Sequence, residues 1–284
     1  MMSVMKRVIL SYIFIVVAFA TVGAQDSTDV KTDSTGTVRN TAIAENKPGG
    51  GKAILEEANA LYNSGDFRKA IEILENEKDA QKSQGLESSG LYYNLGNSYF
   101  RVNEIAKARL YYERALLLDP GDRDTRHNID YVMTKIEDKI PVADTFFLSI
   151  WFGAIQNLFS SNSWATIGVV SFILFVLCLV LFFFSRYILT KKAAFYTGIV
   201  LIIVVIFANI FSFRQKSRIE HRDTAIIMAA SVPMVSSPDI NSKELTILHA
   251  GTKVTVTKED RSWLEVEIDN GTVGWIQREK LEII

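Results

Sequence analysis

Apolar residues recur every three or four positions between residues 52 and 140, which is the spacing of amphipathic helices. The polar segment 63–66 interrupts the pattern and predicts a turn, after which a second helix begins at Phe67. The pattern therefore predicts a helical hairpin at the start of this region. The apolar face of its first helix consists of Ile54, Leu55, Ala58, Leu61 and Tyr62.

The same plan returns in residues 92–120, where a turn is predicted at 103–104. The equivalent residues Ala58 and Gly96 are 38 positions apart. Tetratricopeptide repeats have a period of about 34 residues. We therefore expect the extra length of the first copy to lie in residues 78–89.

Residues 92–120 resemble the tetratricopeptide repeat family, although Tyr92 stands where the family has tryptophan. The resemblance implies pairs of helices that bind other proteins on a concave face, formed by the first helix of each pair. The residues that carry the resemblance are Leu95, Gly96, Tyr99, Ala108, Tyr112, Ala115 and Pro120. The residues expected by resemblance to face the protein-binding groove are Tyr93, Asn94, Asn97 and Arg101.

The small residues of this repeat indicate close helix packing. Glycine inside a helix costs about 1 kcal/mol relative to alanine, so Gly96 is expected where the partner helix must approach closely. Ala108 and Ala115 would present small side chains on that partner, while Tyr99 and Tyr112 fill the space beside them. The aromatic stripe is thus predicted to be helix-pair core rather than a ligand-stacking surface.

One more amphipathic helix is predicted over residues 123–139, and it resembles the helix that caps a repeat array. Residues 52–140 are therefore assigned to a tetratricopeptide repeat domain. Because such arrays usually need three units to close a core, a partner is expected to complete this short one.

Two apolar segments, 164–185 and 193–213, each have about the 20 residues that a membrane-spanning helix needs. Neither apolar run carries a charged residue or histidine, which favours an anchor over a channel or transporter. The connecting segment 186–192 contains three cations and is predicted to be a cytoplasmic loop. Segment 141–163 is predicted to be interfacial, with residues 146–159 as an alternative third crossing.

The orientation of these spans has one conflicting signal. An N-terminal export signal and an even number of spans place both soluble regions outside the cytoplasm. The segment after the second span nevertheless carries cations, although by the positive-inside rule Lys and Arg are more frequent on the cytoplasmic side. These cations, in the predicted linker 214–223, are Arg214, Lys216, Arg218 and Arg222.

The periodicity changes to two in residues 224–284, which predicts β-strands. The sequence Asp269–Gly271 is a hairpin turn signal. This region resembles bacterial SH3-like barrels, of which many bind cell-wall peptides or contact proteins, and the two tryptophans are either stacking platforms or packing residues. The residues singled out for this resemblance or its surface are Gly251, Trp263, Gly271, Gly274 and Trp275.

The N-terminal segment 1–24 has the pattern of a cleaved signal peptide: two cations, a short apolar core and small residues before position 25. An uncleaved anchor helix is the alternative. Segment 25–51 is rich in polar residues and glycine and poor in apolar ones, which predicts a disordered tether.

Composition and the motifs that the sequence lacks argue against nucleic-acid binding, metal binding and catalysis. The net charge of −1 gives no electrostatic argument for nucleic-acid binding. Cys178 is alone in an apolar run, and the three histidines lack metal-ligand spacing. The sequence contains no Walker, dinucleotide or nucleophile-elbow motif, so we expect no catalytic residue, cofactor or metal.

The order of these segments resembles the BatE-like family of the Bacteroides aerotolerance operon group. The fold class is thus multidomain: all-α tetratricopeptide hairpins, two transmembrane helices and a small all-β SH3-like barrel. The resemblance implies a noncatalytic envelope scaffold, and the predicted export signal and even number of spans place it in the inner membrane with both soluble domains periplasmic. Its implied partners are von Willebrand A-domain membrane proteins and a MoxR-type ATPase system, in a complex linked to stress or oxygen tolerance. The alternative is a cell-wall sensor that binds peptidoglycan through the barrel.

Overall fold

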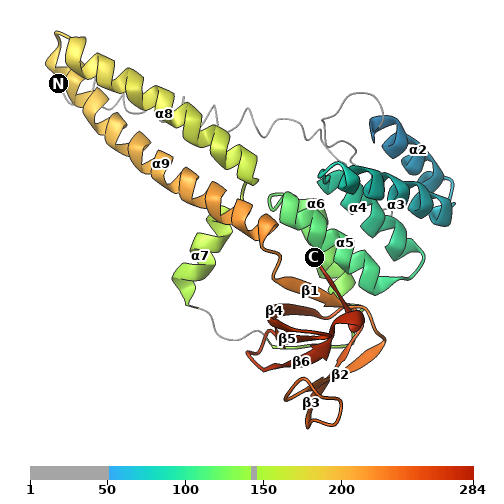
Figure 1. Cartoon of the computed structure of the whole chain (residues 1–284). Helices are drawn as coiled ribbons and strands as arrows, with labels where there is room; N and C mark the ends of the chain where they lie inside the picture. The colour runs from blue at the N-terminus through green and yellow to red at the C-terminus, as the bar shows by residue number, and fades with distance from the viewer. Residues whose placement is uncertain (1–50, 142–145) are drawn as a thin grey trace. The chain divides into compact units, whose positions relative to one another are not determined.

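The computed structural model describes residues 51–141 and 146–284 (Figure 1). The predicted signal peptide and nearly all of the predicted tether lie outside the described residues. Of the described residues, 169–205 form one compact unit and the remainder form another.

Five helices form the first region, and polar caps define several of their ends. The Asp66 carboxylate accepts a hydrogen bond from the backbone N–H of Lys69, and the Ser88 hydroxyl accepts one from Leu91. Such caps satisfy backbone donors that lack an intrahelical partner. The helices are α2 (Gly51–Asn63), α3 (Phe67–Ser83), α4 (Ser89–Arg101), α5 (Ile105–Leu118) and α6 (Arg123–Met133).

The helix boundaries agree with the predicted turns at 63–66 and 103–104. The extra length of the first copy lies in residues 78–89 as predicted, because α3 has 17 residues and α5 has 14. The last helix differs from the prediction: α6 ends at Met133, six residues before the predicted end at 139. Asp138 instead binds the backbone N–H of His249, which holds this segment against the sheet and takes it out of the helix.

The core of the α4–α5 pair consists of small residues and tyrosines. Ala108 and Leu95 are fully buried, and Tyr112 is 2% exposed. A Cβ atom on Gly96 would lie 2.6 Å from two ring carbons of Tyr112. Glycine at this position therefore makes room for the tyrosine ring, as expected from the sequence.

A partly buried carboxylate, that of Glu75, connects three helices. Glu75 accepts hydrogen bonds from the hydroxyls of Tyr99 (2.7 Å) and Tyr111 (2.6 Å) and pairs with Lys78. Partial burial alone would raise the pKa of Glu75, but the hydrogen bonds from Lys78, Tyr111 and Tyr99 outweigh it and lower that pKa. Tyr99 and Tyr111 also stack at 5.4 Å. The aromatic stripe is thus internal packing.

Three apolar helices follow: α7 (Phe147–Gln156), α8 (Ser161–Phe184) and α9 (Ile188–Glu220). By length and composition α8 and α9 could cross a membrane, and only 11% and 28% of their most apolar windows are buried. They are therefore unlike the enclosed core helices of a soluble domain. With 10 residues, α7 has a length of about 15 Å, half of what a bilayer core requires.

The ends of these helices differ from the predicted boundaries. Only Ser185–Tyr187 separate α8 from α9, so most of the predicted loop 186–192 is helical. Similarly, α9 continues to Glu220 through most of the predicted linker 214–223. Helix formation there is supported by Gln215, which donates to the backbone oxygens of Gln156 and Phe159 at 2.8 Å.

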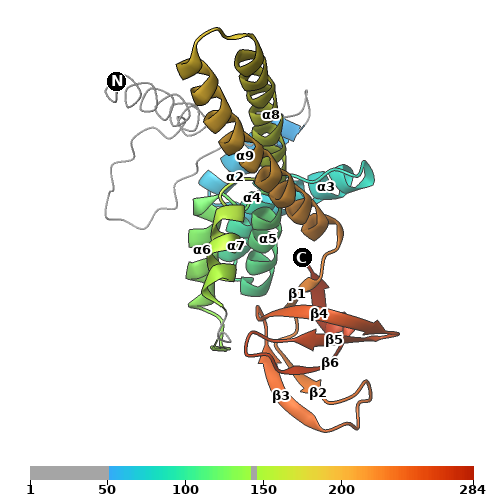
Figure 2. The ribbon, with the colours of Figure 1, turned by 90° about the vertical axis from the view of Figure 1, so that its left-hand side faces the viewer.

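Residues 224–284 form one seven-stranded antiparallel sheet in the order β3-β2-β6-β5-β4-β1-β7 (Figure 2). The register of the β5–β6 hairpin pairs Glu265 with Trp275, and Gly271 with φ +83° makes its turn. The sheet does not close between β3 and β7, so an open SH3-like sheet is found where a barrel was predicted. The strands are β1 (Thr224–Ile227), β2 (Ser231–Val235), β3 (Glu244–His249), β4 (Lys253–Asp260), β5 (Trp263–Glu267), β6 (Val273–Gln277) and β7 (Leu281–Ile283).

The sheet packs directly against α5. Leu110 of α5 forms a buried apolar cluster with Ile226 and Ile284. Arg109, which is 7% exposed, donates to the backbone oxygen of Gly251 at 2.9 Å. We call this contact between residues 105–140, which comprise α5, α6 and the segment after α6, and residues 224–284 the docking interface.

Charged groups complete the docking interface. The buried carboxylate of Glu113 lies 3.6 Å from Arg109 Nε and 2.7 Å from Lys253 Nζ. Arg114 donates to the Glu282 carboxylate (3.0 Å) and to the backbone oxygen of Ile283 (2.6 Å). The helical region and the sheet are therefore held together by apolar and ionic contacts.

A second ionic contact of the docking interface predicts a pH dependence. The Asp138 carboxylate accepts from His249 Nδ1 (2.7 Å) and from the Thr252 hydroxyl (2.6 Å), while His249 Nε2 lies 3.5 Å from Glu137. The hydrogen bond to Asp138 raises the pKa of His249 above its ordinary 6.5. Burial would raise the pKa of Asp138, but the hydrogen bonds from Thr252 and His249 lower it below 3.8.

The contact between the helical region and the sheet is therefore expected to be most stable between pH 3.8 and pH 6.5, the ordinary pKa values of Asp138 and His249. The His249 contribution is complete below pH 6.5 and is lost as pH rises through the folded-state pKa. The Asp138 contribution is complete above pH 3.8 and is lost as pH falls through its folded-state pKa. Hydrogen exchange of the amides around His249 should accelerate as pH rises from about 6 to 8, beyond the intrinsic base-catalysed increase. In H249Q this excess should vanish; an identical excess in the variant would contradict the prediction.

Candidate binding surfaces

Two of the predicted groove residues lie in a polar cluster shared by α4, α5 and α6. The buried Asn97 Oδ1 accepts from the Tyr112 hydroxyl at 2.7 Å and from Asn128 Nδ2 at 3.1 Å. Tyr93 is half-buried, and its hydroxyl lies 3.4 Å from Asn128 Nδ2. Asn97 is thus fixed by internal hydrogen bonds, and within the described part of the chain its own Nδ2 is buried without a partner.

Of the other two predicted groove residues, Arg101 makes its contacts away from this cluster. Arg101 is exposed, and its guanidinium lies 4.5 Å from the ring centre of Phe67 and 5.6 Å from that of Tyr62. Asn94 is half-buried. The structure therefore brings Tyr93 and Asn97 together and directs Arg101 to the α2–α3 turn, where it is available as an exposed cation.

The outward face of the sheet carries the two tryptophans. Trp263 and Trp275 are half-buried, whereas their strand neighbours Leu264 and Ile276 are buried. Because side chains alternate along a strand, both tryptophans lie on the face opposite the sheet core. They combine an apolar ring with an N–H donor at a partly exposed surface, which suits contact with a protein or a cell-wall peptide.

The three glycines predicted from the SH3 resemblance have different roles. Gly271 makes the hairpin turn. A Cβ on Gly274 would lie 2.7 Å from Met234 Cγ, so this glycine lets β2 pass closely. Gly251, with φ +91°, lies in the docking interface, where a Cβ would meet Ile136 at 3.0 Å. Gly251 thus serves contact between the two regions as well as the turn before β4.

Sequence reasoning missed the docking interface itself. Arg109 and Glu113 are four residues apart on α5, which is the ordinary spacing of a solvated helix ion pair. Nothing in the helical pattern indicates that the sheet covers them. The sequence contained only a weak signal for this interface, namely that Arg109 and Glu113 lie close to Leu110 in the apolar stripe of α5.

The described residues contain no cluster of three or more His, Cys, Asp or Glu side chains that could hold a metal ion. The side chains gathered on α4 and on the sheet are tyrosine, asparagine, arginine and tryptophan. This arrangement can make hydrogen bonds and stacking contacts with a partner.

Comparison with known families agrees with the two resemblances. Residues 89–122 match the tetratricopeptide repeat family, and residues 236–282 match the bacterial SH3 domain family. No curated protein matches the chain. The chain thus contains a tetratricopeptide repeat and a bacterial SH3 domain, two modules that suggest protein–protein interaction or cell-wall binding.

Proposed function

We propose that the protein is a noncatalytic, membrane-anchored scaffold that binds other proteins through its tetratricopeptide repeats and SH3-like sheet. One observation carries the proposal: two long, exposed apolar helices lie in the sequence between two binding modules that contact each other. The helices supply the anchor, and the modules supply adjoining binding surfaces.

The docking interface supports a hairpin topology. Arg109 and Gly251 can form their hydrogen bond only if both modules are on the same side of a membrane. The chain between them must then cross an even number of times, as two spans in α8 and α9 would do. An export signal in residues 1–24 would place that side in the periplasm, at the inner membrane.

The mechanism follows from confinement. A membrane anchor raises the effective concentration of partners that are in the same membrane, so weak contacts suffice. By resemblance to the BatE-like family, the proposed partners are von Willebrand A-domain membrane proteins and a MoxR-type ATPase system. The scaffold would then assemble or maintain an envelope complex linked to stress or oxygen tolerance.

Crosslinking and affinity purification from native membranes test this proposal. The full chain should co-purify integral membrane proteins and should resist extraction by alkaline carbonate. An R101E variant, which reverses the exposed cation on α4, should recover less partner, whereas K69E on α3 serves as a matched exposed control. A chain that is released by carbonate, or that recovers no membrane protein, would contradict the scaffold.

Cell-wall binding is the second candidate function, and the partly exposed Trp263 and Trp275 favour it. The full chain in detergent should then sediment with purified peptidoglycan sacculi, and W275A should weaken sedimentation. Because Trp275 lies outside the sheet core, the variant is expected to keep its strand content by circular dichroism. Sedimentation equal to that of a control membrane protein would exclude this function.

A further inference from the structure

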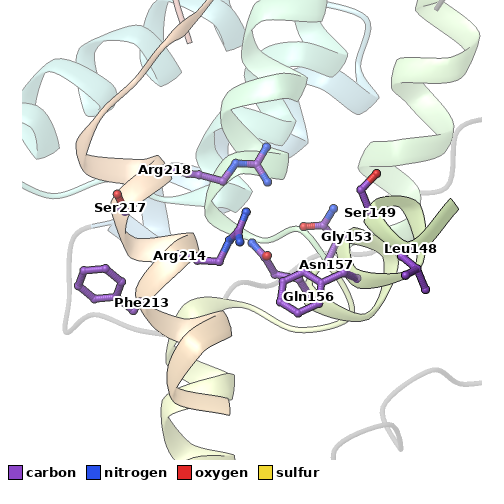
Figure 3. A pocket seen from close by; sticks show the side chains of 10 residues that line it. Leu148, Ser149, Gly153, Gln156, Asn157, Phe213, Arg214, Ser217 and Arg218 are labelled. Carbon is purple, nitrogen blue, oxygen red and sulfur yellow. The ribbon is translucent and has the colours of Figure 1, made fainter. Parts of the chain in front are cut away.

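A pocket of about 760 Å³ lies between α7 and the last turns of α9. Leu148 and Phe152 form an apolar side on α7, and Phe213, Arg214 and Arg218 line the pocket from α9. Figure 3 shows both arginines projecting from α9 toward the part of α7 that bears Gln156. The volume is within the range of small-ligand sites, about 300–1,000 Å³.

The charge in this pocket is uncompensated. None of its ten lining residues is acidic, and within residues 51–141 and 146–284 neither Arg214 nor Arg218 forms an ion pair. Arg214 lies 5.4 Å from the ring centre of Phe152, which holds its guanidinium against the pocket wall. Two adjacent cations without a carboxylate favour an anionic ligand, and guanidinium groups match the geometry of a phosphate.

A second polar group, on Asn157, favours a ligand that has a hydrogen-bond donor in addition to a phosphate. The side-chain oxygen of Asn157, a lining residue, is buried without a hydrogen-bond partner in the described part of the chain. An acceptor in this position calls for a donor on the ligand. A headgroup that joins a phosphate to hydroxyl groups supplies both the anion and the donor.

The position of the pocket just beyond the apolar run of α9 indicates that such a ligand would come from the membrane. Arg214 directly follows the apolar run of α9, and Arg218 is about 6 Å farther along the axis. The headgroup layer on each side of a bilayer is about 5–8 Å thick, so both guanidinium groups reach its level. Trp151 on α7 is 70% exposed, as expected for a ring at the membrane surface.

We propose that this pocket binds the headgroup of an anionic glycerophospholipid. Arg214 and Arg218 bind the phosphodiester, Asn157 accepts a hydrogen bond from a headgroup hydroxyl, and the acyl chains follow the apolar surface of α7. The inference rests on the proposed membrane anchor. It also gives a role to Arg214 and Arg218, two of the four cations that follow the second span on the side where positive charge is disfavoured.

Native mass spectrometry of the full chain in mixed micelles tests the proposal, with phosphatidylglycerol as the probe. The wild type should retain one phosphatidylglycerol, and the R214Q/R218Q variant should bind it about 100-fold more weakly, since two charge-assisted contacts are removed. The matched control is K191Q/K192Q, which removes two cations outside the pocket and should bind like the wild type. Equal binding by R214Q/R218Q and the wild type would overturn the proposal.

Two further probes identify the ligand. Phosphatidylcholine has a phosphate but neither net negative charge nor a headgroup donor, so it should be retained at least about tenfold less. Inorganic phosphate should not displace the lipid; displacement at comparable concentration would assign the pocket to free phosphate and overturn the lipid assignment. Because the assay is done in detergent, it is independent of carbonate extraction, which tests the anchor itself.

Discussion

Replacing Gly96 by leucine is expected to unfold the α4–α5 pair. The Cβ alone would lie 2.6 Å from the Cδ1 and Cε1 atoms of Tyr112, and leucine adds three more carbons in the same direction. Tyr112 cannot move away freely, because its ring is buried and its hydroxyl is bonded to Asn97. Overpacking of this kind costs about 3 kcal/mol or more, a large part of the stability of a small domain.

Glycine-to-alanine variants separate this clash from helix propensity. G96A keeps the Cβ clash and should lower the melting temperature measured by circular dichroism at 222 nm, although alanine is the better helix former. G153A is the matched control, because Gly153 is in the helix α7 and a Cβ added there would have no neighbouring atom within 4 Å. G153A should leave that temperature unchanged or raise it. A G96A protein as stable as the wild type would show that α4 and α5 do not pack in this way.

Replacing Glu113 by alanine is expected to separate the sheet from α5. Glu113 is the carboxylate for both Arg109 and Lys253, and Arg109 is almost fully buried. Removing one member of a buried ion pair leaves an uncompensated charge, which costs about 3–5 kcal/mol. Limited proteolysis of the full chain should then cleave around residues 221–223, between α9 and β1, faster than in the wild type.

The matched control for this variant is E259A. Glu259 pairs with Arg278 within the sheet, but both side chains are more than half exposed, and exposed pairs contribute little. E259A should be cleaved at the wild-type rate. The double variant R109M/E113L removes both buried charges and replaces them by apolar groups, so it should recover much of the lost docking. Equal cleavage of E113A and the wild type would show that the ion pair does not hold the interface.

The local elements could be predicted from the sequence because their causes are local. Polar turns and caps such as Asp66 set the helix ends, the spacing of Gly96 and Tyr112 specified the helix pair, and Asp269–Gly271 specified a hairpin. The lengths of the apolar segments in α8 and α9 likewise predicted two helices long enough to cross a membrane. Each of these features depends on residues within one or two elements.

The surfaces between elements could not be predicted in this way. Asp138 belongs to a helical pattern, and only its hydrogen bonds to His249, 111 residues later, explain why α6 stops at Met133. Asn97 matched a groove position, but hydrogen bonds from Tyr112 and Asn128 hold its oxygen inside the helical region. The pairing of Arg214 and Arg218 with the apolar α7 likewise depends on a tertiary contact that periodicity does not contain.

Arg109 and Gly251 are 142 residues apart in the sequence, so the ribosome completes the two sides of the docking interface at different times. A ribosome adds about 5–20 residues per second, so Gly251 emerges roughly 7–28 s after Arg109. The α4–α5 pair has local contacts and can fold early, but its face around Leu110 stays uncovered during that interval. A nascent chain therefore passes through a stage in which this face is open to chaperones or to another copy of itself.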